Sequence, residues 1–212
     1  MSNSNNPPSA ISDKAFSLSS LKERMEKDVN LPLRKGATRL VFGVGNPDSK
    51  IVFIGEGPGY WEDQKGEPFV GNAGKLLDSL LQSIELDRGG VYITNVVHHR
   101  PPNNRDPLPE EIAAYKPYLD AIIEIIKPKV IVTLGRYSMG IYLPGVKITA
   151  IHGKNFSIKL KDREFVIVPM FHPAAALRST EVMQKIKEDF KKLPELLVGM
   201  NTKIDAEQMQ LV

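Results

Sequence analysis

Short apolar runs alternate along this chain with longer amphipathic segments. The apolar runs stop at glycine or at a polar residue, which is typical of buried strands, and they occupy residues 51–55, 91–97, 129–135 and 164–168. Apolar residues recur at helical spacing in residues 76–84, 110–127 and 183–197. Residues 39–45 also have strand character. Strands that alternate with helices in this order predict a parallel sheet with helices on both faces.

The first strong strand runs directly into the glycine-rich turn Gly55–Gly59, with the sequence GEGPG. Ligands of open α/β sheets bind beyond the carboxyl ends of strands, and glycine lets the backbone approach a ligand closely. Glu56 therefore sits where a ligand is expected, in a turn that Pro58 stiffens. The alternative is a tight turn with one solvated carboxylate, and a short glycine-rich signal alone does not separate the two.

Two other predicted strands lead to polar side chains, Asn95 and His172. Because carboxyl ends of parallel strands share one edge, these residues and Glu56 are expected to line one pocket. Asn95 offers a donor and an acceptor, and His172 can donate to a developing anion. Phe69, in the loop after Gly59, can stack on a flat ring. Taken singly, Asn95 also fits a strand-end turn, His172 a structural histidine, and Phe69 a core position.

The composition is that of a globular domain. The 212 residues are 42% hydrophobic and 25% charged, and we expect one domain at residues 13–200, between a disordered leader (1–12) and a tail (201–212). The lack of cysteine excludes disulfides and thiolate-held clusters. No apolar run reaches the ~18 residues of a membrane span. We expect a cytoplasmic monomer, nucleoid-associated if prokaryotic, without a membrane partner. The net charge of +3 permits a nucleic-acid partner without requiring one.

Five short motifs in this chain resemble those of a known protein family. They read GEGPG at 55–59, GEPFVGNAG at 66–74, TNVV at 94–97, RPPNNRDP at 100–107 and HPAAALR at 172–178. In this order they resemble the uracil-DNA glycosylase superfamily, most closely family 4, over roughly residues 28 to 195. The resemblance implies a three-layer α/β/α fold with a central four-stranded parallel sheet. It also implies a monofunctional DNA glycosylase, which flips uracil out of DNA and hydrolyses its N-glycosidic bond to leave an abasic site.

The resemblance also implies roles for the pocket residues. Asn95 reads the uracil edge, Phe69 stacks on the ring, and the backbone at Gly55 and Gly57 lies against the substrate. His172 stabilises the uracil anion as it leaves. Departure of the base leaves positive charge on the sugar, which a carboxylate stabilises. Glu56 and Glu62 are both candidate catalytic carboxylates.

Contacts to DNA are expected from the loops around this edge. Ala175 and Arg178 belong to the motif that presses into the minor groove in the family, and Leu177 is the expected apolar wedge. Basic side chains that can neutralise phosphates are Lys75, Arg100, Arg105 and Arg178. A charged loop residue is also commonly just solvated.

The chain departs from family 4 at the four cysteines that normally hold a [4Fe–4S] cluster. The flanking motifs place these positions near Asp28, Leu31, His99 and Tyr115. None supplies a thiolate, and the set does not suit zinc. We therefore predict no cluster and no other cofactor, with packing of Leu31 and Tyr115 in its place.

The adjacent histidines His98 and His99 are considered separately, because histidine has a covalent role in a related branch of the superfamily. A related branch bonds covalently to the abasic sugar through a histidine in an inserted basic loop. Here His99 runs directly into Arg100 without an insertion, which does not favour covalent trapping. Phosphate contact, or packing over the vacated cluster position, is the expected role.

Two alternative functions remain open. A protein that kept the pocket but lost turnover would bind uracil or abasic sites in DNA without excising the base. A nucleotide-binding α/β protein would hold phosphate at Gly55–Gly59, but the expected Lys-Ser/Thr pair does not follow Gly59.

Overall fold

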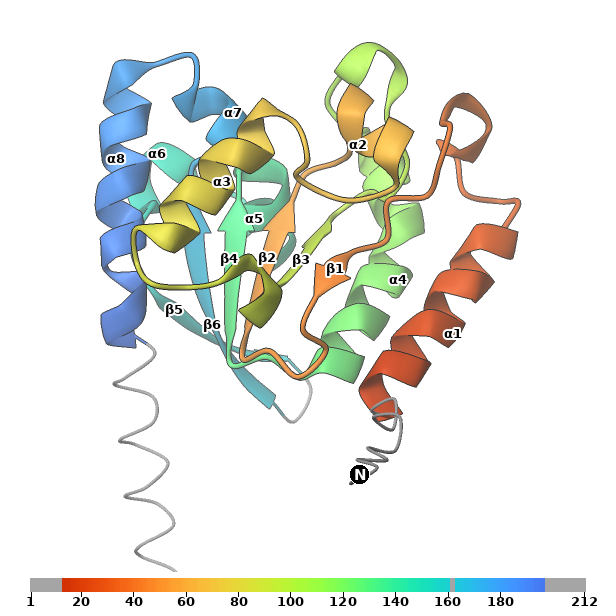
Figure 1. Cartoon of the computed structure of the whole chain (residues 1–212), viewed down its shortest axis with the longest axis horizontal. Helices are drawn as coiled ribbons and strands as arrows, with labels where there is room; N and C mark the ends of the chain where they lie inside the picture. Colours follow the sequence, from red (N-terminus) through yellow and green to blue (C-terminus); the bar gives the residue numbers. More distant parts are fainter. Residues whose placement is uncertain (1–12, 161–162, 197–212) are drawn as a thin grey trace, which may run out of the picture.

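A computed structural model describes residues 13–160 and 163–196 (Figure 1). The predicted leader, 1–12, and tail, 201–212, lie outside the described residues. The boundaries of the predicted domain, 13–200, remain a prediction.

The strands form one sheet in the order β1-β3-β2-β4-β6-β5. Their bounds are Val44–Gly45 (β1), Ile51–Gly55 (β2), Tyr92–Asn95 (β3), Val130–Leu134 (β4), Phe156–Leu160 (β5) and Arg163–Met170 (β6). The inner strands β3, β2, β4 and β6 are parallel, whereas β1 and β5 pair antiparallel at the edges. The predicted central four-stranded parallel sheet is therefore confirmed. The strand expected over 39–45 is shorter than predicted, because only Val44 and Gly45 pair with β3.

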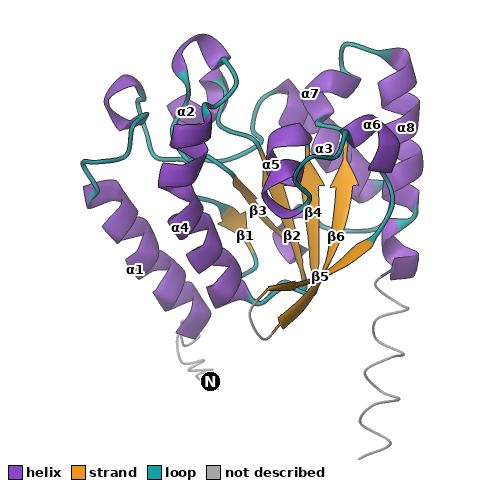
Figure 2. Cartoon of the chain, turned by 180° about the vertical axis from the view of Figure 1, so that it is seen from behind, coloured by secondary structure: helices purple, strands orange, loops and turns teal. Residues whose placement is uncertain are grey.

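Helices cover both faces of this sheet (Figures 1 and 2). The α-helices are Asp13–Lys27 (α1), Tyr60–Lys65 (α2), Asn72–Gln82 (α3), Pro109–Ile126 (α4), Arg136–Tyr142 (α5), Ile148–Ile151 (α6), Pro173–Ala176 (α7) and Thr180–Lys191 (α8). Short 3₁₀ turns occupy Arg34–Gly36 (η1), Arg88–Gly90 (η2) and Pro102–Asn104 (η3). In residues 13–160 and 163–196, no helix combines the length and apolarity that a bilayer crossing requires.

Successive side chains of β2 face opposite sides of the sheet, and this explains why three layers form. Val52 and Ile54 face a core shared with α1 and α4, whereas Ile51 and Phe53 face a core shared with α3 and α8. A strand that is apolar on both sides must be covered on both sides, because each exposed face would leave apolar surface in water. The buried residues of β2 therefore require the helical layers.

The register of the parallel strands brings their polar ends to one edge. Gly55 of β2 lies opposite Asn95 of β3, and Leu134 of β4 lies opposite Met170 of β6. The residues that follow these strands consequently emerge together, on the side of the sheet where α2 and α7 lie (Figure 2). This edge carries the polar residues that the sequence singled out.

Candidate active site

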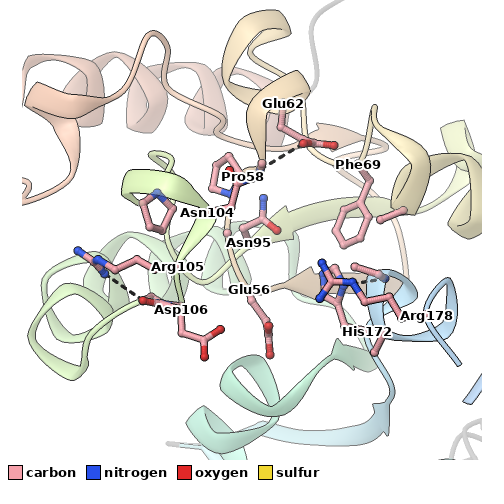
Figure 3. Close-up of a pocket in the computed structure, with 17 residues that line it drawn as sticks. Glu56, Pro58, Glu62, Phe69, Asn95, Asn104, Arg105, Asp106, His172 and Arg178 are labelled. Carbon is pink, nitrogen blue, oxygen red and sulfur yellow. Dashed lines mark hydrogen bonds between the residues drawn. The ribbon is translucent and has the colours of Figure 1, made fainter.

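A pocket of about 380 Å³ opens at this edge of the sheet. It collects most of the predicted site residues, namely Glu56, Gly57, Glu62, Phe69, Asn95, Arg105, His172, Ala175 and Arg178. Figure 3 shows Phe69 and His172 on one side, Asn104 to Asp106 on the other, and Glu56 and Asn95 between them. The structure thus brings these residues together, while their chemical roles remain predictions.

Gly55 forms the floor beneath two of these side chains. A Cβ atom at this position would lie 2.3 Å from Asn95 Oδ1 and 2.6 Å from a ring carbon of Phe69. Any larger residue would push Asn95 or Phe69 out of place, because real Cβ atoms do not approach other atoms so closely. Glycine at position 55 therefore lets an amide and an aromatic ring share one small recess.

Phe69 and His172 form one wall of the pocket. Their rings are stacked, with centroids 5.6 Å apart and planes 25° from parallel. Phe69 is buried and holds a left-handed backbone, with φ of 53°. A non-glycine residue adopts this conformation at a cost, and it persists only where surrounding contacts impose it.

His172 is held in one tautomer by its own backbone turn. Its Nδ1 accepts a hydrogen bond from the backbone N–H of Ala174, at 3.1 Å. In neutral imidazole the proton then resides on Nε2, which is left as a donor. Burial lowers the pKa of His172 to about 4, although the charge of Glu62 opposes this shift. At neutral pH the side chain is therefore an uncharged N–H donor.

Glu56 is a carboxylate in a desolvated position. Its Oε1 accepts the backbone N–H of Tyr137 at 2.9 Å. Burial raises the pKa of Glu56, this hydrogen bond lowers it, and the charge of Asp106 raises it further. Gly135 makes room for the side chain, since a Cβ there would lie 2.3 Å from Glu56 Oε1. Gly135 also has φ of 107°, which favours glycine.

The Glu62 carboxylate accepts three backbone hydrogen bonds. The N–H of Gly59 donates to Oε2 at 3.1 Å, and the N–H groups of Val70 and Gly71 donate to Oε1 at 2.9 and 2.8 Å. One side chain therefore joins the turn after β2 to the start of α3. Phe69 immediately precedes this second anchor point.

Two polar residues that line the pocket, Asn104 and Asp106, were not among the predicted site residues. Asn104 has φ of 54°, and its side-chain oxygen accepts a hydrogen bond from Arg100 Nε at 2.7 Å. Asp106 forms an ion pair with Arg136. The available signal was the Asn103-Asn104 pair in a proline-rich loop, because asparagine tolerates the left-handed region better than most residues.

The basic residues predicted to contact DNA occupy different environments. Arg178 lines the pocket, and Leu177 beside it is 49% exposed. Arg105 lines the pocket too, but its guanidinium makes two hydrogen bonds to the buried carboxylate of Glu111, at 2.8 and 2.6 Å. Lys75 is exposed on α3 and does not line the pocket.

The four residues that the resemblance places near the cluster positions form a packed and hydrogen-bonded group. Leu31 and Tyr115 are buried in the core beneath α1 and α4. The Tyr115 hydroxyl is 2.8 Å from His99 Nδ1, and the Tyr118 hydroxyl donates to Asp28 Oδ2 at 2.7 Å. No group of metal-ligating side chains occurs among the described residues. These residues do not fit a [4Fe–4S] cluster, which requires thiolate ligands.

His98 serves as a structural residue. It is fully buried, and its Nδ1 is 3.1 Å from the carbonyl oxygen of Val41. The backbone N–H of Val41 in turn donates to the carbonyl oxygen of His98. This reciprocal contact fixes the segment before β1 against the end of β3, away from the pocket lining.

Comparison with known proteins places the pocket in a family context. A family model described as the Uracil DNA glycosylase superfamily matches residues 42–196, which include every segment that lines the pocket. The Type-4 uracil-DNA glycosylase of Sulfurisphaera tokodaii is 45% identical over 188 residues, or 86% of each chain. Proteins of the same name are 46% identical in Archaeoglobus fulgidus, over 77% of this chain and 85% of the relative, and 46% identical in Thermotoga maritima, over 80% and 89%.

The three bonds to Glu62 lead to a stability prediction. Replacing Glu62→Gln removes one acceptor oxygen, so backbone N–H groups lose their partner, and the free energy of unfolding should fall by about 1–3 kcal/mol. Urea denaturation measures the change. The matched control is Glu67→Gln, an exposed residue two positions before Phe69, which should change stability little. Equal stability of both variants would show that the carboxylate does not hold this loop.

Proposed function

This chain belongs to the uracil-DNA glycosylase superfamily, and we propose that it excises uracil from DNA by hydrolysing the N-glycosidic bond. The resemblance read from the five motifs is confirmed by the family match. The observation that carries the proposal is the arrangement of one pocket, in which the uncharged donor of His172 and the carboxylate of Glu56 line the same small space. When the bond between base and sugar breaks, the donor stabilises the negative charge on the base and the carboxylate stabilises the positive charge on the sugar.

Recognition of the flipped base falls to Phe69 and Asn95. The Phe69 ring supplies a stacking surface for a planar base. The Asn95 amide offers a donor and an acceptor, which match the carbonyl and N–H groups at the edge of uracil. Gly55 keeps the two side chains together. A base without this edge pattern leaves the buried amide without a partner, which lowers its affinity.

His172 stabilises the leaving group. As the bond between C1′ and N1 breaks, both electrons remain on uracil and negative charge spreads to its oxygens. The Nε2–H of His172 donates to one of these oxygens, while Nδ1 stays anchored to Ala174. A donor fixed before the reaction costs no reorganisation when charge develops.

Glu56 acts on the sugar side. Its negative charge stabilises the positive charge that develops at C1′ and orients the water that attacks there. The water oxygen bonds to C1′, and a proton is released, which Glu56 can accept. The products are free uracil and an abasic site. The monofunctional character proposed here follows from water as the nucleophile.

Glu62 and Arg105 act as positioning residues in this proposal. Both oxygens of Glu62 already accept backbone N–H groups, so its carboxylate serves the loop that presents Phe69. Arg105 is bound to Glu111, whose Oε2 also accepts the N–H of Leu108. That pairing supports a role in holding the segment that carries Asn104 and Asp106.

DNA contacts are proposed for the loop that follows His172. Leu177 is an exposed apolar side chain next to the pocket residue Arg178, an arrangement that suits a wedge beside a phosphate contact. Ala175 lines the pocket mouth between them and His172. Arg100 and Lys75 remain predicted phosphate contacts further out. Monomeric state and cytoplasmic location remain predictions of the sequence.

We also propose that the enzyme works without an iron–sulfur cluster. The support is the donor chemistry at the four positions, where Asp28 and Tyr115 are already hydrogen-bonded and Leu31 has no ligand atom. The α4 tyrosines tie the end of α1 and the loop after β3 to one helix. They thereby provide the cross-connection that a cluster would supply.

Uracil excision is the direct test of the function. Wild-type protein incubated with a labelled, uracil-containing single strand should produce alkali-sensitive abasic sites. His172→Ala should lower single-turnover release by about 100- to 1,000-fold, because it removes one preorganised donor. Asn95→Ala should also lower it, with little change in affinity for uracil-free DNA. Absence of strand breaks at stoichiometric wild-type protein would contradict the proposal, and selective binding without breaks would favour the uracil-binding alternative.

The pH dependence distinguishes the roles of the two titrating groups. Release should rise with pH through an apparent pKa above 4.5, the ordinary value for glutamate, because burial raises the pKa of Glu56 and the ionised form is active. It should then stay level once Glu56 is ionised, since His172, with a pKa of about 4, is neutral there too. Glu56→Gln should lose the part of the acid limb that lies above the His172 pKa of about 4. A fall in rate as pH rises through 6.5, the ordinary histidine value, would show that the charged imidazole is needed.

The proposal that no cluster is bound predicts the iron content of the purified protein and the stability of a Tyr115 variant. Purified protein should lack stoichiometric iron and acid-labile sulfide. Tyr115→Phe should lower the free energy of unfolding by about 1–3 kcal/mol, because the buried His99 loses its partner. Tyr118→Phe, at a less buried position, is the matched comparison and should cost less. Four irons per chain, or an unchanged stability of Tyr115→Phe, would contradict the proposal.

A further inference from the structure

Two large aromatic side chains are exposed side by side on α2. Tyr60 is 49% exposed and Trp61 is 58% exposed. Their ring centroids are 5.1 Å apart, with planes at 78°. An edge-on contact of this kind covers less ring surface than a parallel stack. Adjacent exposed aromatic rings at the edge of a pocket are typical of an interaction surface.

This pair sits on the rim of the candidate active site. The residues on either side of it, Gly59 and Glu62, both line the pocket. Trp61 packs toward Gly71, where a Cβ would lie 3.5 Å from Trp61 Cδ1. The aromatic pair is therefore continuous in sequence with two residues that line the pocket, and Glu62 lies at its edge next to Phe69 (Figure 3).

A cation completes the surface. The guanidinium of Arg100 lies over the Tyr60 ring, 5.2 Å from its centroid. Arg100 immediately precedes the pocket residue Pro101, and its Nε donates to Asn104 at 2.7 Å. The positive charge is thus fixed between the aromatic pair and the pocket. Aromatic faces beside a fixed cation match the two parts of a nucleotide, a base and a phosphate.

We propose that Tyr60 and Trp61 form a stacking platform for an unpaired base of the uracil-containing strand, next to the flipped nucleotide. Arg100 binds the phosphate between that base and the uracil. The inference rests on the proposed function and adds a substrate preference to it. In a duplex, neighbouring bases stack on each other and pair with the other strand, so their faces are not free. The platform therefore favours single-stranded over double-stranded DNA.

The lone tryptophan makes binding at this platform observable. Trp61 is the only tryptophan in the chain, so its fluorescence reports on α2 alone. A uracil-free single-stranded oligonucleotide should quench the fluorescence of the full-length protein at concentrations where a duplex of the same length does so weakly. Because this titration needs no catalysis, it tests the platform even if uracil excision fails.

Substitutions test the same point through kinetics. Trp61→Ala and Tyr60→Ala should each raise KM for a single-stranded uracil substrate by about 5- to 100-fold, the range expected for one lost base stack. They should leave kcat within about twofold and affect duplex substrate less, because the pocket chemistry is unchanged. Trp61→Phe keeps a ring and should retain most of the affinity. Phe16→Ala on α1, an aromatic that is 67% exposed, is the matched control and should behave as wild type.

The outcomes separate the two proposals. A wild-type protein that quenches with single strands but releases no uracil would keep the platform and overturn the proposed activity. A protein that excises uracil normally, with no quenching and an unchanged KM in Trp61→Ala and Tyr60→Ala, would overturn the platform alone. Equal quenching by duplex and single strand would also overturn the stated preference.

Discussion

The pocket depends on one carboxylate that holds the backbone at both ends of the segment leading to Phe69. Glu62 binds the backbone at Gly59 with one oxygen and at Val70 and Gly71 with the other. These two anchor points are the end of the turn after β2 and the start of α3. Phe69, just before the second anchor point, has a left-handed backbone and stacks on His172. A charged acceptor suits this role because hydrogen bonds to an ionised group are stronger than neutral ones.

The sheet positions the other side chains of the pocket. The parallel register of β2 and β3 places Asn95 beside Gly55, and β6 delivers His172 to the same edge. Burial makes His172 a neutral donor and raises the pKa of Glu56, so both groups respond to desolvation in the same recess. In the proposed reaction, the charge separation that occurs when uracil leaves is matched by groups whose positions are fixed beforehand. In the proposed platform, Tyr60 and Trp61 on α2 extend this recess toward a neighbouring unpaired base.

The sequence was sufficient for the central sheet and for most of the side chains at its edge, but not for Asn104 and Asp106. Continuous apolar runs identify buried strands, and polar residues at their ends, such as Asn95, stand out against them. The antiparallel edge strand β1 was overestimated, because strand propensity in residues 39–45 carries no information on how many residues find a partner. Individual contacts between side chains could not be predicted either. The Arg105–Glu111 pairing and the Tyr118–Asp28 hydrogen bond join loops and helices whose separation only the fold defines.

The neutral, Nε2-protonated state of His172 is the feature on which the proposed chemistry turns. Nitrogen-15 NMR of histidine-labelled protein measures it directly, and with four histidines in the chain the His172→Ala variant assigns the signal. The account predicts, at neutral pH, an uncharged ring with a protonated Nε2 and an unprotonated Nδ1. An imidazolium, or a proton on Nδ1, would contradict it, because His172 could then neither accept from Ala174 nor act as the uncharged donor to the departing base.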